Sequence, residues 1–512
     1  MMWQVWVSVG VATAILAVYR MRKRINPDFG LPVVGSPNDQ NMANAVLEGY
    51  RKYPDSAFVI PCDPPRVILP MNLYQEVIHA PMSELSFHAE VYDAFVGRYS
   101  HVGESRGEVV KAVQHDLTRS LPGVLLPIQE EVRVGMKQLF GQSNKWKAFN
   151  ANQLALRMVA LMSGRVFVGL PLSRDEEWLR ASITFTTNVA KCRIAALQWN
   201  PWVRPFVLRF LPEVRHVRQE LQRATEWMRP LVNEILQNEH AVEDKLAKPG
   251  TRGAFISRMM NYLPDHMKTA EEMGIDQMLL SFASIHTTSS TTTFALFDLV
   301  SRPEYIKPLR DELEHVIAQE GVETNEDGHT FLSKSSLGKL KKLDSFIKES
   351  QRLNPLNMGG SPRRLQKDQT FSNGLKLPAG APISFPLWGV YNSPTVQTFS
   401  PEYNEKAGNA KPNEFDGFRF ARLREQPELE MRHQAVTTGP DAFNFGHGPH
   451  ACPGRFFAIY MIKCIFIELL LNYDFQLKGS DGNGSESRPP NVVKQMMNLP
   501  NFAAEVEVRK RG

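Results

Sequence analysis

Cysteine is scarce in this 512-residue chain, which has only four: Cys62, Cys192, Cys452 and Cys464. Four widely spaced cysteines cannot staple a chain of this length, so we exclude a disulfide framework and expect a reducing compartment. The histidines form no His-Glu-x-x-His motif, and no cysteine and histidine lie at zinc-ligand spacing. These absences exclude a small secreted scaffold and the common sequence patterns of zinc sites.

The chain also has only a small excess of charge of one sign. The net charge is +5 at pH 7, and no long block of like charge follows the N-terminus. Such a weak and diffuse basic balance gives no support for a nucleic-acid partner, so we expect none. No Gly-x-Gly-x-x-Gly segment follows a predicted strand, so the chain is expected to carry no flavin- or nucleotide-binding segment of its own.

One long apolar run is present, at residues 2–19. It is about long enough to cross a hydrocarbon core of roughly 30 Å, and a basic cluster at residues 20–24 follows at once. We therefore expect a single-pass signal-anchor over residues 1–24, with the rest of the chain cytosolic. A cleaved secretory signal and a buried core helix are the alternatives, and the basic cluster after the run disfavours both. Prolines and glycines predict a hinge over residues 25–40, followed by one large domain over residues 41–512.

The periodicity of the large domain predicts a mainly α fold with a minor β part. Apolar residues recur mostly at helical spacing, while a few short segments alternate and carry turn residues. The sequence predicts short strands and then a helix at 56–80, mainly helices at 125–300, single helices at 302–320 and 337–353, a few strands at 356–400, and a long helix from His450 to about Leu471.

The segment at residues 443–458, FNFGHGPHACPGRFFA, places one cysteine among glycines and prolines just before a strongly helical run. Glycines let a backbone approach a flat ligand closely and adopt positive φ. A thiolate at a helix N-terminus is stabilised by the helix dipole and by free backbone N–H groups. From this loop alone, a site for an anionic sulfur and a buried free cysteine remain equal alternatives.

The pattern Phe445-Gly446-x-Gly448-x-His450-x-Cys452-x-Gly454 closely resembles the haem-binding loop of the cytochrome P-450 family. The resemblance implies the helix-rich cytochrome P-450 fold, haem b as cofactor and Cys452 as the axial ligand of its iron. It also implies that the cofactor contacts Phe445, Gly446 and Gly454. His450 stands where the family usually has an arginine that contacts a haem propionate, and histidine retains a hydrogen bond there.

Glu349 and Arg352 lie three residues apart in the predicted helix 337–353, so both charges share one face. Taken alone they indicate a surface ion pair worth less than about 1 kcal/mol. In this order before the cysteine loop they resemble the structural Glu-x-x-Arg motif of the family, and Arg419 stands in the place of its third member. The resemblance implies a structural triad rather than a catalytic role.

Residues 278–300 contain seven consecutive serines and threonines, Thr287 to Thr293, which propensity alone would favour as a strand. The run nevertheless resembles the long helix that crosses the haem in the family. Thr287 then matches the threonine that guides protons during oxygen activation. His286 replaces the usual carboxylate, and histidine relays protons near neutral pH. A stripe of threonines that only packs helices is the alternative.

Further matches fall on residues that contact the haem propionates in the family. His115 and Arg119 have the four-residue spacing that puts both on one helix face. Arg363 follows Arg352 by eleven residues and matches another propionate contact, with its neighbour Arg364 as a rival. Solvated arginine side chains are the alternative at each position.

The resemblance implies a haem-thiolate monooxygenase that uses O2 and NADPH-derived electrons. A membrane-bound NADPH–cytochrome reductase is the expected donor and cytochrome b5 a further candidate, with Arg455 and Lys463 expected on the docking surface. The catalytic domain is expected on the cytosolic face of the endoplasmic reticulum membrane. Two alternatives remain: a non-oxygenating isomerase or dehydratase of the same fold, and a non-enzymatic haem sensor.

Family topology assigns substrate contact to four stretches rich in Met, Phe and Leu and poor in charge, which implies a bulky apolar substrate. The resemblance to fungal members of secondary-metabolite pathways favours a terpenoid (di-, sesqui-, indole-di- or meroterpenoid) over a polyketide or an alkaloid. Residues 196–212 mix aromatic side chains with arginine and predict either contact with the membrane surface or a surface loop. The four stretches are 85–105, 278–282, 357–361 and 495–500.

Overall fold

The computed structural model describes residues 28–141, 143–200, 203–237, 250–325, 328, 330–396, 400–479 and 487–511. The predicted anchor at residues 1–24 lies outside this part of the chain. Within the described residues, no helix combines the length and the apolar character needed to cross a bilayer. The predicted hinge is described from residue 28 onward, and there the Val34 N–H donates to the Val59 carbonyl oxygen at 2.9 Å.

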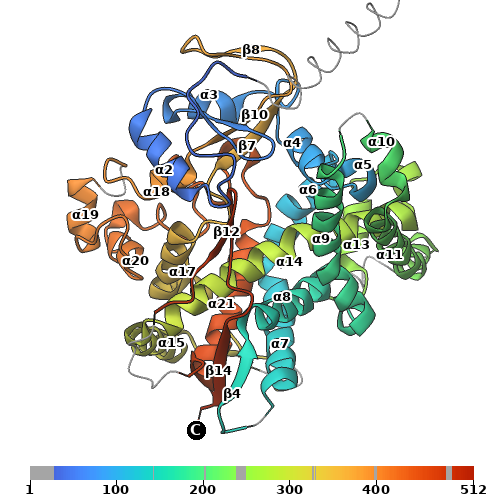
Figure 1. Ribbon diagram of the computed structural model, residues 1–512. Coiled ribbons are helices and arrows are strands. Elements are labelled where there is room, and N and C mark those ends of the chain that lie inside the picture. Colours follow the sequence, from blue (N-terminus) through green and yellow to red (C-terminus); the bar gives the residue numbers. More distant parts are fainter. Residues whose placement is uncertain are drawn as a thin grey trace, which may run out of the picture.

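The described chain is rich in helices, as predicted, and a minor β part accompanies them (Figure 1). The α-helices are α2 (Ala43–Lys52), α3 (Tyr74–His79), α4 (Phe87–Ala94), α5 (Gly97–Ser100), α6 (Gly107–Lys111), α7 (Leu121–Phe140), α8 (Ala151–Phe167), α9 (Glu176–Leu197), α10 (Arg204–Val207), α11 (Pro212–Gln237), α13 (Ala254–Met260), α14 (Ala270–Val300), α15 (Ile306–Glu320), α16 (Lys334–Lys339), α17 (Lys341–Leu353), α18 (Leu387–Tyr391), α19 (Pro401–Ala407), α20 (Arg419–Leu423) and α21 (Arg455–Asn472).

The strands form small sheets, the largest with the order β1-β2-β10-β7-β3 and a second with the order β11-β14-β4. The two-residue and three-residue strands are short because prolines and turns interrupt the alternating segments. The strands are β1 (Phe58–Ile60), β2 (Arg66–Ile68), β3 (Leu85–Ser86), β4 (Lys147–Asn150), β5 (Glu323–Thr324), β6 (Thr330–Phe331), β7 (Gly360–Leu365), β8 (Gln369–Thr370), β9 (Lys376–Leu377), β10 (Pro382–Phe385), β11 (Tyr473–Leu477), β12 (Val492–Lys494), β13 (Met497–Leu499) and β14 (Glu505–Lys510).

Helix α14 crosses the middle of the molecule and packs against α8, α9, α11 and α17 (Figure 1). Its threonines are helical despite their propensity, because most of the helix is buried and their hydroxyl groups bond within it. The Thr292 and Thr293 hydroxyls each donate to the carbonyl oxygen four residues earlier at 2.8 Å. Packing and internal hydrogen bonds therefore outweigh a propensity difference of a few tenths of a kcal/mol per residue.

The single helix predicted at 337–353 is wrong in detail, since Leu340 leaves the helical conformation and separates α16 from α17. Glu312 explains the break: its carboxylate accepts the Lys342 N–H at 2.6 Å and the Leu343 N–H at 3.0 Å. A carboxylate from another helix thus caps the start of α17. Residues 356–400 contain the predicted strands, together with α18, which the alternating pattern did not indicate.

Candidate functional site

The cysteine loop, residues 443–454, precedes α21 and is shaped by two glycines. Gly446 and Gly448 have φ of +66° and +71°, a left-handed conformation that favours glycine. Across the loop, the Cys452 N–H donates to the Phe445 carbonyl oxygen at 2.7 Å. The sequence therefore determines the bend of this loop locally, and one backbone hydrogen bond holds the cysteine within it.

Cys452 lies just before the first turn of α21, where free backbone N–H groups collect. The backbone N–H groups of Gly454 and Arg455 lie near its sulfur, and the Arg455 side chain adds positive charge. Burial nevertheless raises the pKa of the Cys452 thiol above its ordinary value. Because a coordinated metal ion deprotonates a thiol outright, this donor set suits a sulfur that becomes anionic on metal binding.

One face of α14 is exposed near the middle of the helix. From Glu272 to Val300, only Ala283 and Thr287 are exposed, and their spacing of four puts both on the same face. The Thr287 hydroxyl donates to the Ala283 carbonyl oxygen at 2.7 Å. These two side chains are therefore accessible on a helix that is otherwise largely surrounded by protein.

His286 points toward a different neighbour from Thr287. Its Nε2 lies 2.8 Å from the carbonyl oxygen of Ile183 in α9, and since a carbonyl only accepts, Nε2 carries the hydrogen. Burial lowers the pKa of His286, and the bond to Ile183 opposes this effect in part. The imidazole is therefore neutral at pH 7, with Nδ1 as its unprotonated nitrogen.

Arg363, in β7, is a buried cation that forms no ion pair with an acid of the described residues. The residue is 3% exposed, its Nε has no hydrogen-bond partner, and Nη1 donates to the Pro362 carbonyl oxygen at 2.8 Å. Burial lowers its pKa, and burial followed by the charge of Arg363 lowers the pKa of both His88 and His450. A buried guanidinium without a counter-charge is costly, so this corner suits the anionic group of a ligand.

Arg364 faces the other way from Arg363, as alternation along a strand requires. Its Nη2 lies 2.9 Å from Glu90 Oε2, and its Nε lies 3.1 Å from Asp93 Oδ2. Both carboxylates come from α4, so Arg364 ties this helix to the largest sheet. Its charge is already compensated, unlike the charge of Arg363.

The His115 and Arg119 side chains are both exposed and form no hydrogen bond or ion pair with another described residue. His115 lies in a π-helical segment, Ala112–Leu117, that continues α6. One extra residue per turn shifts the direction of the side chains, yet residues four apart still share roughly one face. Both side chains are free to contact a ligand, and their assignment to a propionate stays a prediction.

Glu349, Arg352 and Arg419 meet in the core rather than at the surface. Arg352 forms two parallel hydrogen bonds with Glu349, at 2.7 and 2.8 Å, and the Arg419 Nε lies 3.4 Å from Glu349 Oε1. Arg419 and Glu349 are completely buried. Arg419 also donates to the carbonyl oxygens of Ala410 and Lys411, at 2.8 and 3.1 Å. The triad thus joins α17 to the long segment that precedes the cysteine loop.

The four stretches predicted to contact substrate are brought together by short-range contacts. Strand β3 pairs with β7 through Ser86 and Arg364, and Asn357 forms a bridge with Met497. Phe95 and Phe282 form an edge-to-face aromatic pair with centroids 5.1 Å apart. Tyr99, Val102 and Met278 of the first two stretches share one apolar cluster at the N-terminal half of α14, whereas Met358 and Met496 of the other two lie in a separate cluster.

Known proteins are similar to this chain over most of its length. A sequence model of the cytochrome P-450 family matches residues 78–499. The chain belongs to the cytochrome P-450 family. It is 40% identical over 512 residues to cytochrome P-450 monooxygenase ascG of Acremonium egyptiacum, covering 99% of this chain and 95% of the relative. It is also 42% identical over 475 residues to cytochrome P-450 monooxygenase 3 of Gibberella fujikuroi, covering 91% and 89%. The resemblance inferred from the motifs is thereby confirmed.

Membership makes this chain a cytochrome P-450 monooxygenase, with haem as its cofactor and a redox partner as its source of electrons. The residues present fit that cofactor. The Cys452 thiol, with backbone N–H groups near it, suits a metal ion, and the buried Arg363, which has no ion pair among the described residues, suits an anionic group. His88, near Arg363, was not predicted. It is a lone histidine on a short helix, and nothing in the sequence distinguishes it from a surface residue.

Lys463 corrects one expectation about the redox partner. It was expected on the docking surface with Arg455, but it is 4% exposed and its Nζ lies 2.7 Å from Asp344 Oδ1. Asp344 also accepts from Arg424 at 2.9 Å. Lys463 therefore joins α21 to α17 inside the protein, since position 463 falls on a side of α21 that packs against other helices.

Replacing Arg363 by leucine tests whether this arginine binds the cofactor. Loss of a charge-assisted hydrogen bond worth about 1.5–3 kcal/mol should speed haem release about 10- to 100-fold. Haem transfer to excess apomyoglobin measures this rate without reference to turnover. Arg364→Leu is the matched control and should leave the rate nearly unchanged. If haem release became faster by the same factor in both variants, Arg363 would have no specific role in binding the cofactor.

Proposed function

We propose that this monooxygenase hydroxylates a bulky apolar secondary metabolite at a haem whose axial ligand is Cys452. The observation that carries the ligand assignment is the position of Cys452 just before α21, with the N–H groups of Gly454 and Arg455 near its sulfur. These donors would hold negative charge on the sulfur and tune the bound iron. The His450 and Arg363 side chains, with His115 and Arg119, would bind the propionates.

Bound haem would supply the activation of O2, with electrons delivered from outside the chain. The chain's own residues position protons for that chemistry. The Thr287 side chain is exposed on α14, and its hydroxyl, which donates to the Ala283 carbonyl oxygen, would guide protons there. His286 is held at Nε2 by the Ile183 carbonyl, so its Nδ1 is the nitrogen available to take up a proton.

We infer a terpenoid substrate, of the sesqui-, di-, indole-diterpenoid or meroterpenoid type, in a fungal pathway. Support comes from the apolar region around Phe95 and Phe282, where rings and aliphatic side chains outnumber charges. The relatives that match over most of their length are monooxygenases of fungi, among them ataF of Aspergillus terreus at 35% identity. A polyketide or an alkaloid of similar size is the second candidate.

Feeding candidate terpenoids to yeast cells that co-express the chain and a fungal reductase tests this function. A product heavier by one oxygen should appear only with both proteins present. Thr287→Ala should keep binding but lower product formed per NADPH by about tenfold or more, because a positioned proton-transfer group typically contributes about 10²–10⁴-fold to a rate. Conversion of polyketides or alkaloids instead would overturn the terpenoid assignment, and conversion without NADPH would point to an isomerase or a dehydratase.

We propose NADPH–cytochrome reductase as the electron donor, with cytochrome b5 as a second one. Arg455 remains a candidate contact because its side chain is partly exposed at the start of α21. An acidic partner surface would be attracted to it and would approach the cysteine loop from this side.

Location at the endoplasmic reticulum membrane is supported by a patch in the segment between α9 and α11. Phe206 and Phe210 are 64% and 68% exposed, and Arg204 and Arg209 lie beside them. Exposed aromatic side chains interleaved with arginine are typical of a segment that enters the membrane surface. The patch would then lie at the lipid boundary, where an apolar substrate is concentrated.

A fluorescent label at Phe206→Cys tests this contact in the full chain reconstituted into phospholipid vesicles. Lipid-borne quenchers should reduce its emission severalfold, because the label should lie at the depth of the acyl-chain boundary. Met431→Cys, an equally exposed apolar position at 70%, is the matched control and should be unaffected. Equal quenching at both positions would refute the contact.

A further inference from the structure

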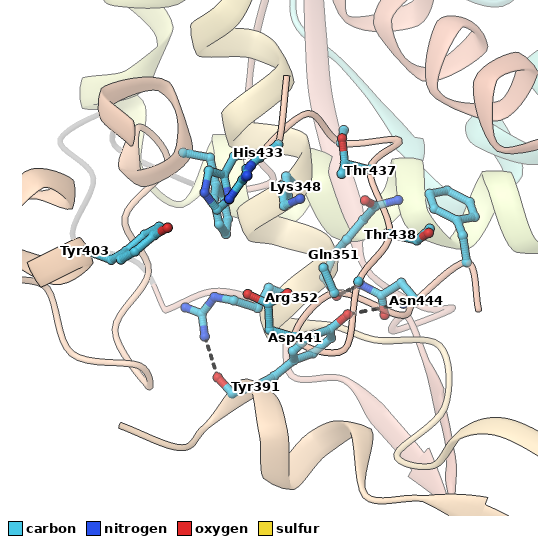
Figure 2. A pocket seen from close by; sticks show the side chains of 16 residues that line it. Lys348, Gln351, Arg352, Tyr391, Tyr403, His433, Thr437, Thr438, Asp441 and Asn444 are labelled. Carbon is cyan, nitrogen blue, oxygen red and sulfur yellow. Dashed lines mark hydrogen bonds between the residues drawn. The ribbon is translucent and has the colours of Figure 1, made fainter. Parts of the chain in front are cut away.

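A cavity of about 200 Å³ lies beside the cysteine loop, separate from the exposed face of α14 (Figure 2). Its walls come from α17, α18, α19, α20 and the segment at residues 432–445. Phe445, which accepts the Cys452 N–H, lines it, whereas Cys452 does not. Polar side chains face it, so the cavity does not resemble a site for an apolar substrate.

Lys348 brings a buried positive charge to this cavity. It is 7% exposed, its Nζ donates to the Gln434 carbonyl oxygen at 2.9 Å, and the ammonium lies 5.0 Å from the Phe420 ring. No carboxylate forms an ion pair with it among the described residues, because Asp344 is taken by Arg424 and Lys463. Burial lowers the pKa of Lys348 to about 8, and the negative charges of Asp441, which also lines the cavity, and of Asp344 oppose this effect.

His433 brings an unpaired nitrogen to the same cavity. It is 8% exposed, and its buried Nε2 has no hydrogen-bond partner. Its ring stacks on Phe420 at 6.0 Å and meets Tyr403 edge-on at 6.1 Å, so the imidazole cannot turn freely to find a partner elsewhere. A buried polar atom without a partner costs about 1–3 kcal/mol, which a suitable ligand would recover.

We propose that this cavity binds a small oxyanion, held by the Lys348 ammonium and by the buried His433 Nε2, which would carry the ring hydrogen when the anion is bound. An anion would compensate the buried charge of Lys348 and would accept a hydrogen bond from His433. One ligand would thus provide both the counter-charge and the hydrogen-bond partner. Arg432, exposed at the rim, adds positive charge at the entrance. Free phosphate and the carboxylate of a small acid share the required chemistry, and the volume admits either with bridging water.

Occupancy would stabilise the segment that carries the cysteine loop. Asn444 donates through its backbone to the Tyr391 hydroxyl at 3.2 Å and through its side chain to the Gln351 carbonyl oxygen at 3.2 Å. These bonds make the wall of the cavity continuous with the start of the loop (Figure 2). The oxyanion would therefore act as a structural ligand near the haem side of the protein rather than as a substrate.

Binding of inorganic phosphate and of acetate to the full-length holoenzyme tests the proposal, at pH 7 and constant ionic strength set with chloride. Calorimetry should show saturable binding of one anion, and the temperature of haem loss should rise in parallel. Lys348→Met should weaken binding about tenfold or more, as expected for loss of one charge-assisted bond. Lys342→Met, an exposed lysine of the same helix, is the matched control and should bind as wild type.

Because Lys348 adjoins Glu349, Lys348→Met counts only if its reduced CO spectrum matches that of the wild type. His433→Gln is the second variant and should weaken binding severalfold, since its amide restores the hydrogen bond only in part. If phosphate binds and acetate does not, the ligand of the cavity is a phosphate. If acetate binds and phosphate does not, the ligand is a carboxylate. The proposal would be overturned if phosphate and acetate gave only non-saturable effects equal to those of chloride. It would also be overturned if both variants bound the anions as the wild type does. In either case the cavity would hold only water.

Discussion

Cys452→Ser should abolish the thiolate-haem band in the reduced, CO-bound spectrum and lower turnover by about 10³-fold or more, the scale of loss when a group at the reaction centre is removed. A serine hydroxyl stays protonated and donates far less electron density to iron than a thiolate does. The N–H groups of Gly454 and Arg455 would then face a neutral oxygen. The difference spectrum of carbon monoxide binding is the measurement, with product formation as a second readout.

Cys62→Ser is the matched control for this substitution. The Cys62 thiol is buried and donates to the Pro64 carbonyl oxygen at 3.3 Å, a bond that serine can keep. Its spectrum and turnover should equal those of the wild type. A thiolate band that survives Cys452→Ser would show that another residue binds the iron and that the ligand proposal is wrong.

Glu349→Gln should lower the free energy of unfolding by about 3–5 kcal/mol, because it leaves two buried guanidinium groups without their carboxylate. Arg352 and Arg419 are 4% and 0% exposed, so water cannot replace the lost charge. The whole free energy of unfolding of a typical protein is about 5–15 kcal/mol, so little holoenzyme should accumulate. Denaturant unfolding and the yield of haem-loaded protein measure the effect.

Glu177→Gln is the matched control, since the Glu177–Arg223 pair has the same 2.7 Å separation as Glu349–Arg352 but lies at the surface. Its loss should cost less than about 1 kcal/mol. Although burial opposes ionisation, Arg352 and Arg419 lower the pKa of Glu349 below its ordinary 4.5. The advantage of the wild type should therefore be complete above that value and disappear as the pH falls through the lowered pKa. Similar losses in both variants would make the triad an ordinary ion pair.

Much of the fold follows from local pattern. The helix of α21 and the strands of β7 to β10 were predicted from periodicity, since their apolar positions already match one conformation. The pattern was insufficient at Leu340, where Glu312 from another helix interrupts a run that looks continuous. It was also insufficient for α14, whose threonines become helical through burial on nearly all sides.

In the candidate site, too, some features follow from the local sequence and others only from tertiary packing. Gly446, Gly448 and the helix that follows Cys452 are local features, so the sequence indicated a loop that holds a sulfur. No local feature separates Arg363 from Arg364, because adjacent residues of a strand point to opposite faces and only the packing partners show which face is which. The partners of Arg364 lie in α4, far away in sequence.

By itself, the sequence determined the family, the position of the cysteine loop and the predominance of helices, because these depend on motif order, glycine conformation and periodicity. The tertiary structure decided which charges are buried and which are compensated. It placed Lys463 inside the protein, left Arg363 without an ion pair among the described residues and gathered Lys348 and His433 around one cavity. Burial and charge compensation depend on distant segments that meet only after folding, and a linear pattern contains no record of those distances.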